Sequence, residues 1–209
     1  MSGPACDIPG LNLAVPPDRL PAPVQAAEPD IGVAVLAGGC FWCTEAVFSQ
    51  LDGVRSVEPG YAGGHALRAN YEAVCTGTTG HAEAIRIVYD PARIAFGTLL
   101  QVFFAVAHDA TQRDRQGNDI GSQYRSAVFP QDAAQQACAE AYIRQLTEAG
   151  AFLAPVATTI EPGHVFHPAE AYHRDYAARN PQQPYIRAVS APKAAKLRRF
   201  FPALLKTGA

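Results

Sequence analysis

The chain has 209 residues, of which 48% are hydrophobic and 17% are charged, and its net charge is −2. These values are typical of one globular domain with a sizeable core, and they give no indication of a nucleic-acid or membrane-surface partner. No apolar run approaches the ~18 residues that a membrane-spanning helix needs. The five cysteines lack the spacing of a disulfide framework, so we expect a reducing, cytoplasmic location without a secretory leader.

The N-terminal part differs in composition from the rest of the chain. Residues 1–30 contain seven prolines and show little hydrophobic periodicity. Such a composition is typical of an extended, poorly ordered arm. We therefore predict a proline-rich extension over residues 1–30, followed by a single folded domain over residues 31–209 that ends in a basic tail.

Strand and helix patterns are interspersed through this domain. The predicted strands are 31–36, 54–61, 81–90, 122–129 and 155–161. The predicted helices are one that ends at 52–53, then 70–75, 96–108, 131–149, 168–179 and 190–205. Because the order is not a strict strand–helix alternation, we predict an α+β fold. It is a two-layer sandwich with a mixed, mainly antiparallel sheet, a ferredoxin-like core and flanking helices.

Two cysteines lie on the turn between the first predicted strand and its helix. Gly38-Gly39 makes the turn tight, and Cys40 begins the helix. Unpaired N–H groups and the helix dipole favour a thiolate at such a place. Cys40 is therefore the candidate nucleophile, and Phe41-Trp42 separates it from Cys43.

Four interpretations of this cysteine pair compete. The pair could be buried core residues, although a Gly-Gly turn is a poor place to hide a thiol. It could be a general thiol–disulfide oxidoreductase site that uses the Cys40/Cys43 dithiol. It could bind zinc together with His164 and His167, although their spacing is shorter than usual and a metal would block the thiolate. It could also be a redox nucleophile with a neighbouring resolving cysteine.

A carboxylate in the third predicted strand is the candidate acid. The alternation over 81–90 places Glu83 on the same face as two isoleucines. Burial there raises the pKa of a carboxyl group and keeps it protonated, which suits a proton donor. The alternative is an ion pair with Arg86 or Arg125.

The remaining candidates carry little weight one by one. The loop over 109–121 is long and polar, and such loops are often functional. Asp119 in this loop would by default cap a turn. Tyr71 and Tyr124 would by default be amphipathic core residues.

In combination, these motifs resemble the peptide methionine sulfoxide reductase A family. The blocks that carry the resemblance are 39–42, 60–64, 71–77, 80–84, 88–91, 116–119, 121–126, 169–173 and 180–181. The resemblance extends from about residue 31 to residue 186. It leaves the proline-rich extension and the basic tail outside.

The resemblance implies thiol-dependent reduction of the S epimer of methionine sulfoxide, in oxidised proteins and as the free amino acid. Cys40 would attack the sulfur and become a sulfenic acid. The oxygen must be protonated, so Glu83 would be the proton donor, with Tyr71 and Tyr124 as hydroxyl donors.

The substrate also needs to be held in place. An apolar slot made by Phe41 and Trp42 would hold its methyl group, and by resemblance Asp119 arranges the substrate and its water. The resemblance further implies no bound cofactor, regeneration by thioredoxin and a role in protein repair under oxidative stress. We also expect a monomer.

The chain departs from the common family pattern in its cysteines. Many members carry glycine at the position of Cys43 and resolving cysteines near the C-terminus, whereas this chain has none after Cys138. We hypothesise that Cys43 resolves the sulfenic acid, because positions three apart are neighbours on a helix. Cys75 is the second candidate; we expect Cys138 in the core and Cys6 in the extension.

Overall fold

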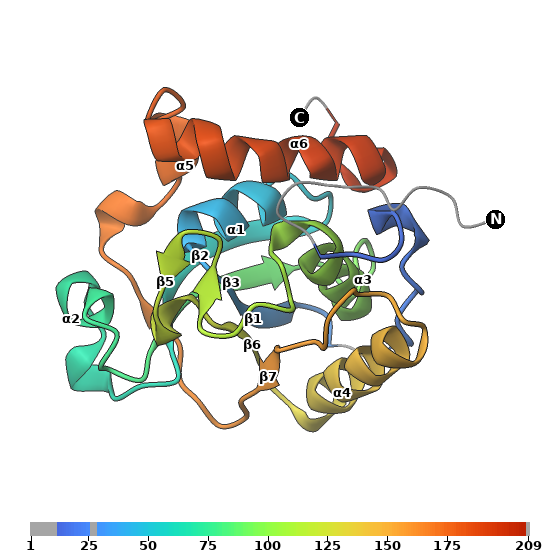
Figure 1. Cartoon of the computed structure of the whole chain (residues 1–209), viewed down its shortest axis with the longest axis horizontal. Helices are drawn as coiled ribbons and strands as arrows, with labels where there is room; N and C mark the ends of the chain where they lie inside the picture. The colour runs from blue at the N-terminus through green and yellow to red at the C-terminus, as the bar shows by residue number, and fades with distance from the viewer. Residues whose placement is uncertain (1–11, 26–28, 208–209) are drawn as a thin grey trace.

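A six-stranded sheet forms the centre of the computed structural model, which describes residues 12–25 and 29–207 (Figure 1). Its strands are β1 (Gly32–Gly38), β2 (Val54–Ala62), β3 (Ala82–Tyr89), β6 (Ser126–Phe129), β7 (Thr159–Ile160) and β8 (His167–Pro168). They lie in the order β7-β6-β1-β3-β2-β8, and only the β6–β7 pairing is parallel. The predicted mixed, mainly antiparallel sheet is therefore confirmed. A separate hairpin joins β4 (Arg115–Gln116) to β5 (Asp119–Ile120).

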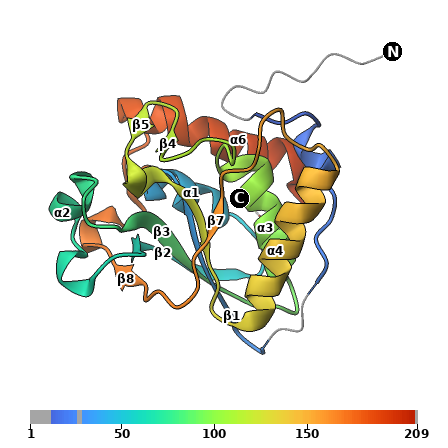
Figure 2. The same ribbon diagram turned by 60° about the horizontal axis from the view of Figure 1, so that its bottom comes forward.

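Helices connect and cover these strands. They are α1 (Phe41–Phe48), α2 (Tyr71–Cys75), α3 (Phe96–Val102), α4 (Ala133–Glu148), α5 (Tyr176–Arg179) and α6 (Ala191–Phe200). The chain order β1-α1-β2-β3-α3-β6 and the central strand order β6-β1-β3-β2 make up the ferredoxin-like core that we predicted. Figure 2 shows α4 lying beside α3, and Figure 1 shows α6 across the outside of α1.

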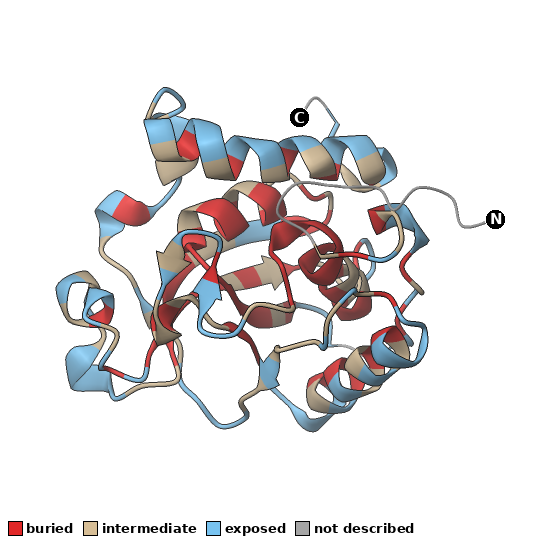
Figure 3. Ribbon diagram, in the orientation of Figure 1, coloured by how far each residue is buried: buried red, intermediate tan, exposed pale blue. Residues whose placement is uncertain are grey.

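The main core lies between the sheet and the helices α1 and α3. On β3, Glu83, Ile85 and Ile87 point into this layer, as the period of two predicts. Ala84 points to the opposite face, where it belongs to a smaller cluster that Phe166 helps to cover. Figure 3 shows the resulting buried interior around the sheet, α1 and α3. The strand thus delivers one carboxyl group into an otherwise apolar layer.

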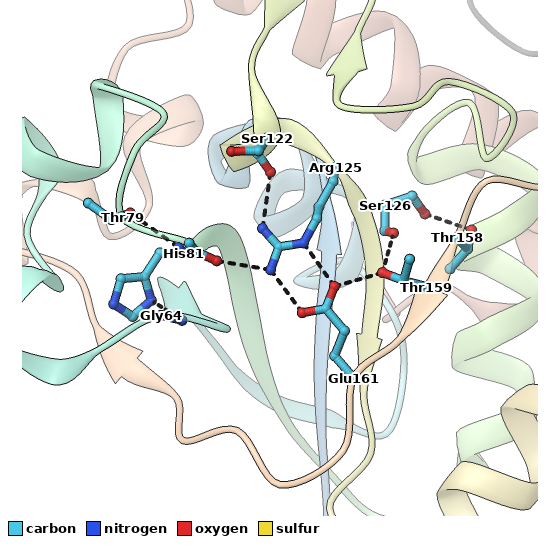
Figure 4. Close-up of polar contacts among 10 residues, drawn as sticks. Gly64, Thr79, His81, Ser122, Arg125, Ser126, Thr158, Thr159 and Glu161 are labelled. Atoms are coloured by element: carbon cyan, nitrogen blue, oxygen red, sulfur yellow. Dashed lines mark hydrogen bonds and ion pairs between the residues drawn. The ribbon is translucent and has the colours of Figure 1, made fainter.

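A half-buried ion pair links three segments at the end of the sheet (Figure 4). The Arg125 guanidinium donates to both carboxylate oxygens of Glu161, at 2.8 and 2.9 Å. It also donates to the carbonyl oxygens of Ser122 and Gly80, each at 3.1 Å. Bidentate, partly buried pairs of this kind hold their geometry better than exposed ones. The pair therefore fixes the turn that carries Tyr124 relative to the start of β3.

Three predicted elements are shorter or more broken than their patterns indicated. The predicted strand 122–129 is a strand only from Ser126, because 122–124 forms a 3-10 turn. The predicted helix 168–179 breaks at Asp175, which has a φ of 54°. The break has a tertiary cause, since the buried carboxyl of Glu45 accepts the Asp175 N–H at 2.9 Å. The predicted strand 155–161 likewise keeps only β7.

Residues 12–25 pack against the domain, which differs from the poorly ordered arm that their prolines predicted. Leu13 and Leu20 are both only 4% exposed and belong to the main core. The Ala14 N–H donates to the Ala151 carbonyl oxygen at 2.9 Å. Prolines remove backbone donors, so such a segment is held by a few apolar anchors rather than by a ladder of hydrogen bonds. Residues 1–11, including Cys6, lie outside the described residues.

Within the described ranges, no helix combines the length and the apolar character that crossing a membrane requires.

The packing of residues 12–25 predicts a measurable cost for removing an anchor. Leu20→Ala should lower the free energy of unfolding by about 2–4 kcal/mol, because a buried leucine leaves a cavity. Val24→Ala is the matched control, since Val24 is 72% exposed and should change stability by less than about 0.5 kcal/mol. Urea unfolding measures both. Equal effects of the two substitutions would contradict the packing.

Candidate active site

Cys40 lies at the N-cap of α1, on the tight turn that follows β1. Gly39 has a φ of +82°, and a Cβ atom there would lie 2.5 Å from the Gln116 Cγ, so the turn requires glycine. Cys40 is 8% exposed and Cys43, one helical turn later, is fully buried. Cys40 therefore lies at the helix start, as the sequence predicts, but its side chain is more buried than an open turn would leave it.

A cavity of about 170 Å³ opens onto the Cys40 thiol. It is lined by Cys40, Phe41, Trp42, Tyr71, Glu83, Asp119, Tyr124 and Tyr185. The first seven are among the eight site residues predicted from the sequence, and they come from α1, α2, β3, β5 and the turn before β6. Cys43, the eighth, does not line the cavity. Tyr185, from the segment before α6, was not predicted.

Glu83 is the buried acid of this cavity. It is 2% exposed, and its Oε2 accepts the N–H of Phe41 at 3.0 Å. Burial raises the pKa of Glu83 to about 8, the charge of Asp119 acts in the same direction, and the Phe41 hydrogen bond opposes both. The alternative of an ion pair is wrong, because Arg86 pairs with Glu58 and Arg125 pairs with Glu161. At neutral pH the carboxyl group is therefore mostly protonated, which suits a proton donor.

The two thiols have opposite pKa shifts. Burial raises the pKa of Cys40 well above its ordinary value, and the neighbouring Cys43 and Glu83 add to the rise. Desolvation therefore opposes the thiolate that the helix N-terminus favours at Cys40. The hydrogen bond from Cys40 lowers the pKa of Cys43 to about 7 against its burial, helped by the charge of Lys193. The two thiols thus titrate as a pair.

Two tyrosine hydroxyls complete the polar side of the cavity. Burial raises the pKa of both Tyr71 and Tyr124, and the charge of Glu83 adds to each shift. Both side chains therefore remain O–H donors at any physiological pH. They line the same cavity as Cys40 and Glu83.

The aromatic wall is held by the segment that follows β8. The indole of Trp42 stacks on Tyr176 with 3.9 Å between ring centroids, and its Nε1–H donates to His173 Nδ1 at 3.1 Å. Burial lowers the pKa of His173, so this ring is neutral and accepts at Nδ1. Glu170 holds Tyr71 from the same segment, since its Oε1 accepts the Tyr71 N–H at 2.9 Å.

Sequence reasoning missed His173, Tyr176 and Tyr185 as parts of the site. The block 169–173, which contains His173, was identified only as one of the blocks that resemble the family. Tyr185 follows Pro184 with no periodic pattern that would single it out. Its hydroxyl lies 3.8 Å from the Cys43 sulfur and donates to Asp119 Oδ2 at 2.5 Å.

The other described cysteines differ in their access to the cavity. Cys75 is exposed at the end of α2. Cys138 is buried in α4, where its thiol contacts the Val24 carbonyl oxygen at 3.3 Å. All four described cysteines, Cys40 and Cys43 included, are free thiols. Cys75 therefore remains the second candidate for the resolving role.

The residues of the zinc hypothesis are not gathered in one place. His164 packs its ring against Phe129, on the sheet face opposite Glu83, and His167 packs against His81. Among residues 12–25 and 29–207, no three His, Cys, Asp or Glu side chains are grouped so that they could hold a metal ion.

A larger cavity of about 320 Å³ lies between α1, α5 and α6. Glu45 lines it, and burial raises the pKa of this carboxyl group to about 7. None of the cysteines that the structure describes lines this second cavity. Thiol chemistry therefore belongs to the smaller cavity at Cys40.

The raised pKa of Glu83 predicts a specific dependence of stability on pH. The folded state holds one more proton than the unfolded state between the ordinary pKa of 4.5 and about 8. Stability should therefore fall as the pH rises through this window, by up to about 1.4 kcal/mol per pH unit from this group. Urea unfolding of the parent and of Glu83→Gln from pH 5 to 8 isolates the effect. The variant should gain stability relative to the parent as the pH rises, and parallel curves would contradict the raised pKa.

Comparison with known proteins places this site in a family. The model of the family described as peptide methionine sulfoxide reductase matches residues 32–203. The chain is 53% identical to peptide methionine sulfoxide reductase MsrA of Thermus thermophilus over 174 residues, which is 83% of this chain and 97% of the relative. It is also 53% identical to the MsrA of Chromobacterium violaceum over 173 residues, covering 83% of this chain and 98% of the relative.

Solved structures agree with this result. Methionine sulfoxide reductase A of Corynebacterium diphtheriae is similar with a TM-score of 0.61 and 33% identity, covering 83% of this chain and 86% of that chain. Reduced Mxr1 from Saccharomyces cerevisiae is similar with a TM-score of 0.65 and 32% identity, covering 78% of this chain and 93% of that chain. Because it matches the family model and these relatives over most of its length, and because it holds a buried acid beside a thiol, the chain belongs to the peptide methionine sulfoxide reductase family.

Proposed function

We propose that this chain reduces the S epimer of methionine sulfoxide to methionine, with Cys40 as the nucleophile. The observation that carries the proposal is the joint placement of Cys40 and a protonated Glu83 in one cavity with an aromatic wall. The proposed substrate is methionine sulfoxide in oxidised proteins and as the free amino acid. The S preference follows the family.

Binding would orient the three substituents of the sulfoxide sulfur. The methyl group packs against Phe41 and Trp42, which offer an apolar slot. The oxygen then faces Glu83 and the hydroxyls of Tyr71 and Tyr124. These donors match a polar S–O bond whose negative charge grows during reduction.

Proton transfer from Glu83 to the oxygen would start the chemistry. It leaves the sulfur electron-poor and leaves Glu83 as a carboxylate, which can take the proton of the Cys40 thiol. Because the pKa of Cys40 is raised, its thiolate would form only after a sulfoxide has accepted the proton of Glu83. The sulfur of Cys40 gains the oxygen and becomes a sulfenic acid, while the substrate sulfur is reduced to the thioether.

Cys43 would resolve this sulfenic acid by attack on the Cys40 sulfur, which forms a Cys40–Cys43 disulfide and releases water. The place of Cys43 one helical turn after Cys40 and the lowered pKa of Cys43 support this assignment. A dithiol must then reduce the disulfide. Thioredoxin as this reductant, a cytoplasmic location and a monomeric state remain predictions.

A general thiol–disulfide oxidoreductase is the second candidate function. It would need protein disulfides to reach the thiols directly. Cys40 is nearly buried and Cys43 is fully buried, so the cavity admits a small reactive group more readily than a protein disulfide. A dithiol exchanger would also have no use for a protonated Glu83.

The role of Glu83 separates the two functions. Glu83→Gln should lower the rate of methionine formation from the S sulfoxide on the order of 100-fold, because it removes the acid that protonates the oxygen. Disulfide exchange with a small disulfide should change little. Glu148→Gln, at an exposed position in α4, is the matched control. Activity is measured on separated S and R sulfoxides with a dithiol reductant, and Cys40→Ser should be inactive on both. Full activity of Glu83→Gln would overturn the proposed acid.

The resolving role of Cys43 can be mapped directly. After one turnover without reductant, peptide mass mapping should find a Cys40–Cys43 disulfide. Cys43→Ser should leave Cys40 as a sulfenic acid that dimedone traps. A parent disulfide between Cys40 and Cys75 would instead assign the resolving role to the exposed cysteine.

A further inference from the structure

Tyr185 connects two groups of the cavity that the proposed chemistry uses separately. Its hydroxyl oxygen lies 3.8 Å from the Cys43 sulfur, with the thiol as donor. The same hydroxyl donates to Asp119 Oδ2 at 2.5 Å. The donors therefore point in one direction, from the thiol through the phenol to the carboxylate.

The resolving step needs a proton acceptor at Cys43. The thiol must lose its proton when its sulfur attacks Cys40, because the thiolate is the nucleophile. Cys43 is fully buried, so bulk water does not take the proton directly. Glu83 is unsuited to this task, since it must give a proton to the departing hydroxide.

We propose that Tyr185 relays the proton of the Cys43 thiol to the Asp119 carboxylate during attack on the Cys40 sulfenic acid. The proposal rests on the resolving role of Cys43 under the proposed function. The S–O bond of the sulfenic acid breaks as the Cys40–Cys43 S–S bond forms. The hydroxide leaves as water with a proton from Glu83, and the thiol proton ends on Asp119. No external oxidant or reductant is needed, because the sulfenic acid is reduced as the Cys43 thiol is oxidised.

The phenol would act as a conduit rather than as a base. Burial and the two neighbouring thiols raise the pKa of Tyr185 far above its ordinary value, so a free tyrosinate does not accumulate. A hydroxyl that receives one proton while it donates another needs no such charge. Asp119 carries the negative charge at the end of this hydrogen-bond relay, and its charge raises the pKa of both Glu83 and Tyr124.

The competing explanation is purely electrostatic. The hydrogen bond with Cys40, the charge of Lys193 and the hydrogen bond with Tyr185 lower the pKa of Cys43, whereas burial and the charge of Asp119 raise it. If Lys193 and Cys40 alone supply the thiolate, the phenol is only a wall of the cavity. The relay differs from this explanation because it requires the hydroxyl and the carboxylate together.

The division of the Cys40 sulfenic acid between the disulfide and a trapping reagent measures the resolving step alone. Hydrogen peroxide converts Cys40 to the sulfenic acid without a sulfoxide, and dimedone competes with Cys43 for it. Peptide mass mapping gives the ratio of the Cys40 adduct to the disulfide. Tyr185→Phe should shift this ratio toward the adduct on the order of 100-fold, the contribution of a general base. Tyr142→Phe is the matched control, because its buried hydroxyl has no hydrogen-bond partner among the described residues and its ratio should equal that of the parent.

Asp119→Asn tests whether the two groups act as one unit. It should shift the ratio as Tyr185→Phe does, and the double variant should be no worse than either single variant. An unchanged ratio in Tyr185→Phe, or multiplicative effects of the two substitutions, would overturn the relay. An unchanged disulfide yield in Cys43→Ser would overturn it too, through the resolving role.

A parallel single turnover with methionine S-sulfoxide keeps the two proposals apart. In Tyr185→Phe, the resolving step should lose far more rate than methionine formation at saturating substrate does, since a resolving base is not used in sulfoxide reduction. An equal loss of both steps would assign Tyr185 to substrate binding and overturn the relay. Failure of the parent itself to form methionine would contradict the proposed function, whereas the peroxide partition would still report on the relay.

Discussion

The structure depends on one hydrogen bond across the main core, from the N–H of Phe41 to the Oε2 of Glu83. It joins the first turn of α1 to the start of β3, so it fixes the acid beside the thiol of Cys40. The bond also satisfies an N–H that the start of a helix leaves unpaired. The cost of burying the carboxyl group is met by keeping it neutral, which is the state that proton donation requires.

Elements that are distant in the sequence hold this arrangement in place. The ferredoxin-like order puts β1, which leads to Cys40, directly beside β3, which carries Glu83. The ion pair of Arg125 and Glu161 ties the turn of Tyr124 to the same strand. The segment after β8 then closes the aromatic wall through His173 and Tyr176. The cavity is therefore a product of the whole fold rather than of the Cys-x-x-Cys turn alone.

Much of this was predictable because the signals are local. Alternation along β3 predicted that Glu83 would share a face with two isoleucines, and the Gly-Gly turn predicted a thiol at a helix start. The pKa of Cys40 was not predictable in this way, because it depends on burial by residues from other elements. His173 and Tyr185 were missed for the same reason, since only the fold brings them to α1. The packing of residues 12–25 was not predicted, because a proline-rich composition indicates disorder and gives no sign that two leucines anchor the segment.

The account rests most directly on the proton of Glu83. Infrared difference spectroscopy between the parent and Glu83→Gln reports whether this carboxyl group is protonated, through its C=O stretching band. We predict a protonated-carboxyl band at pH 6 that is lost as the pH rises through about 8 and is absent from the variant. A carboxylate that is already ionised at pH 6 would contradict the account.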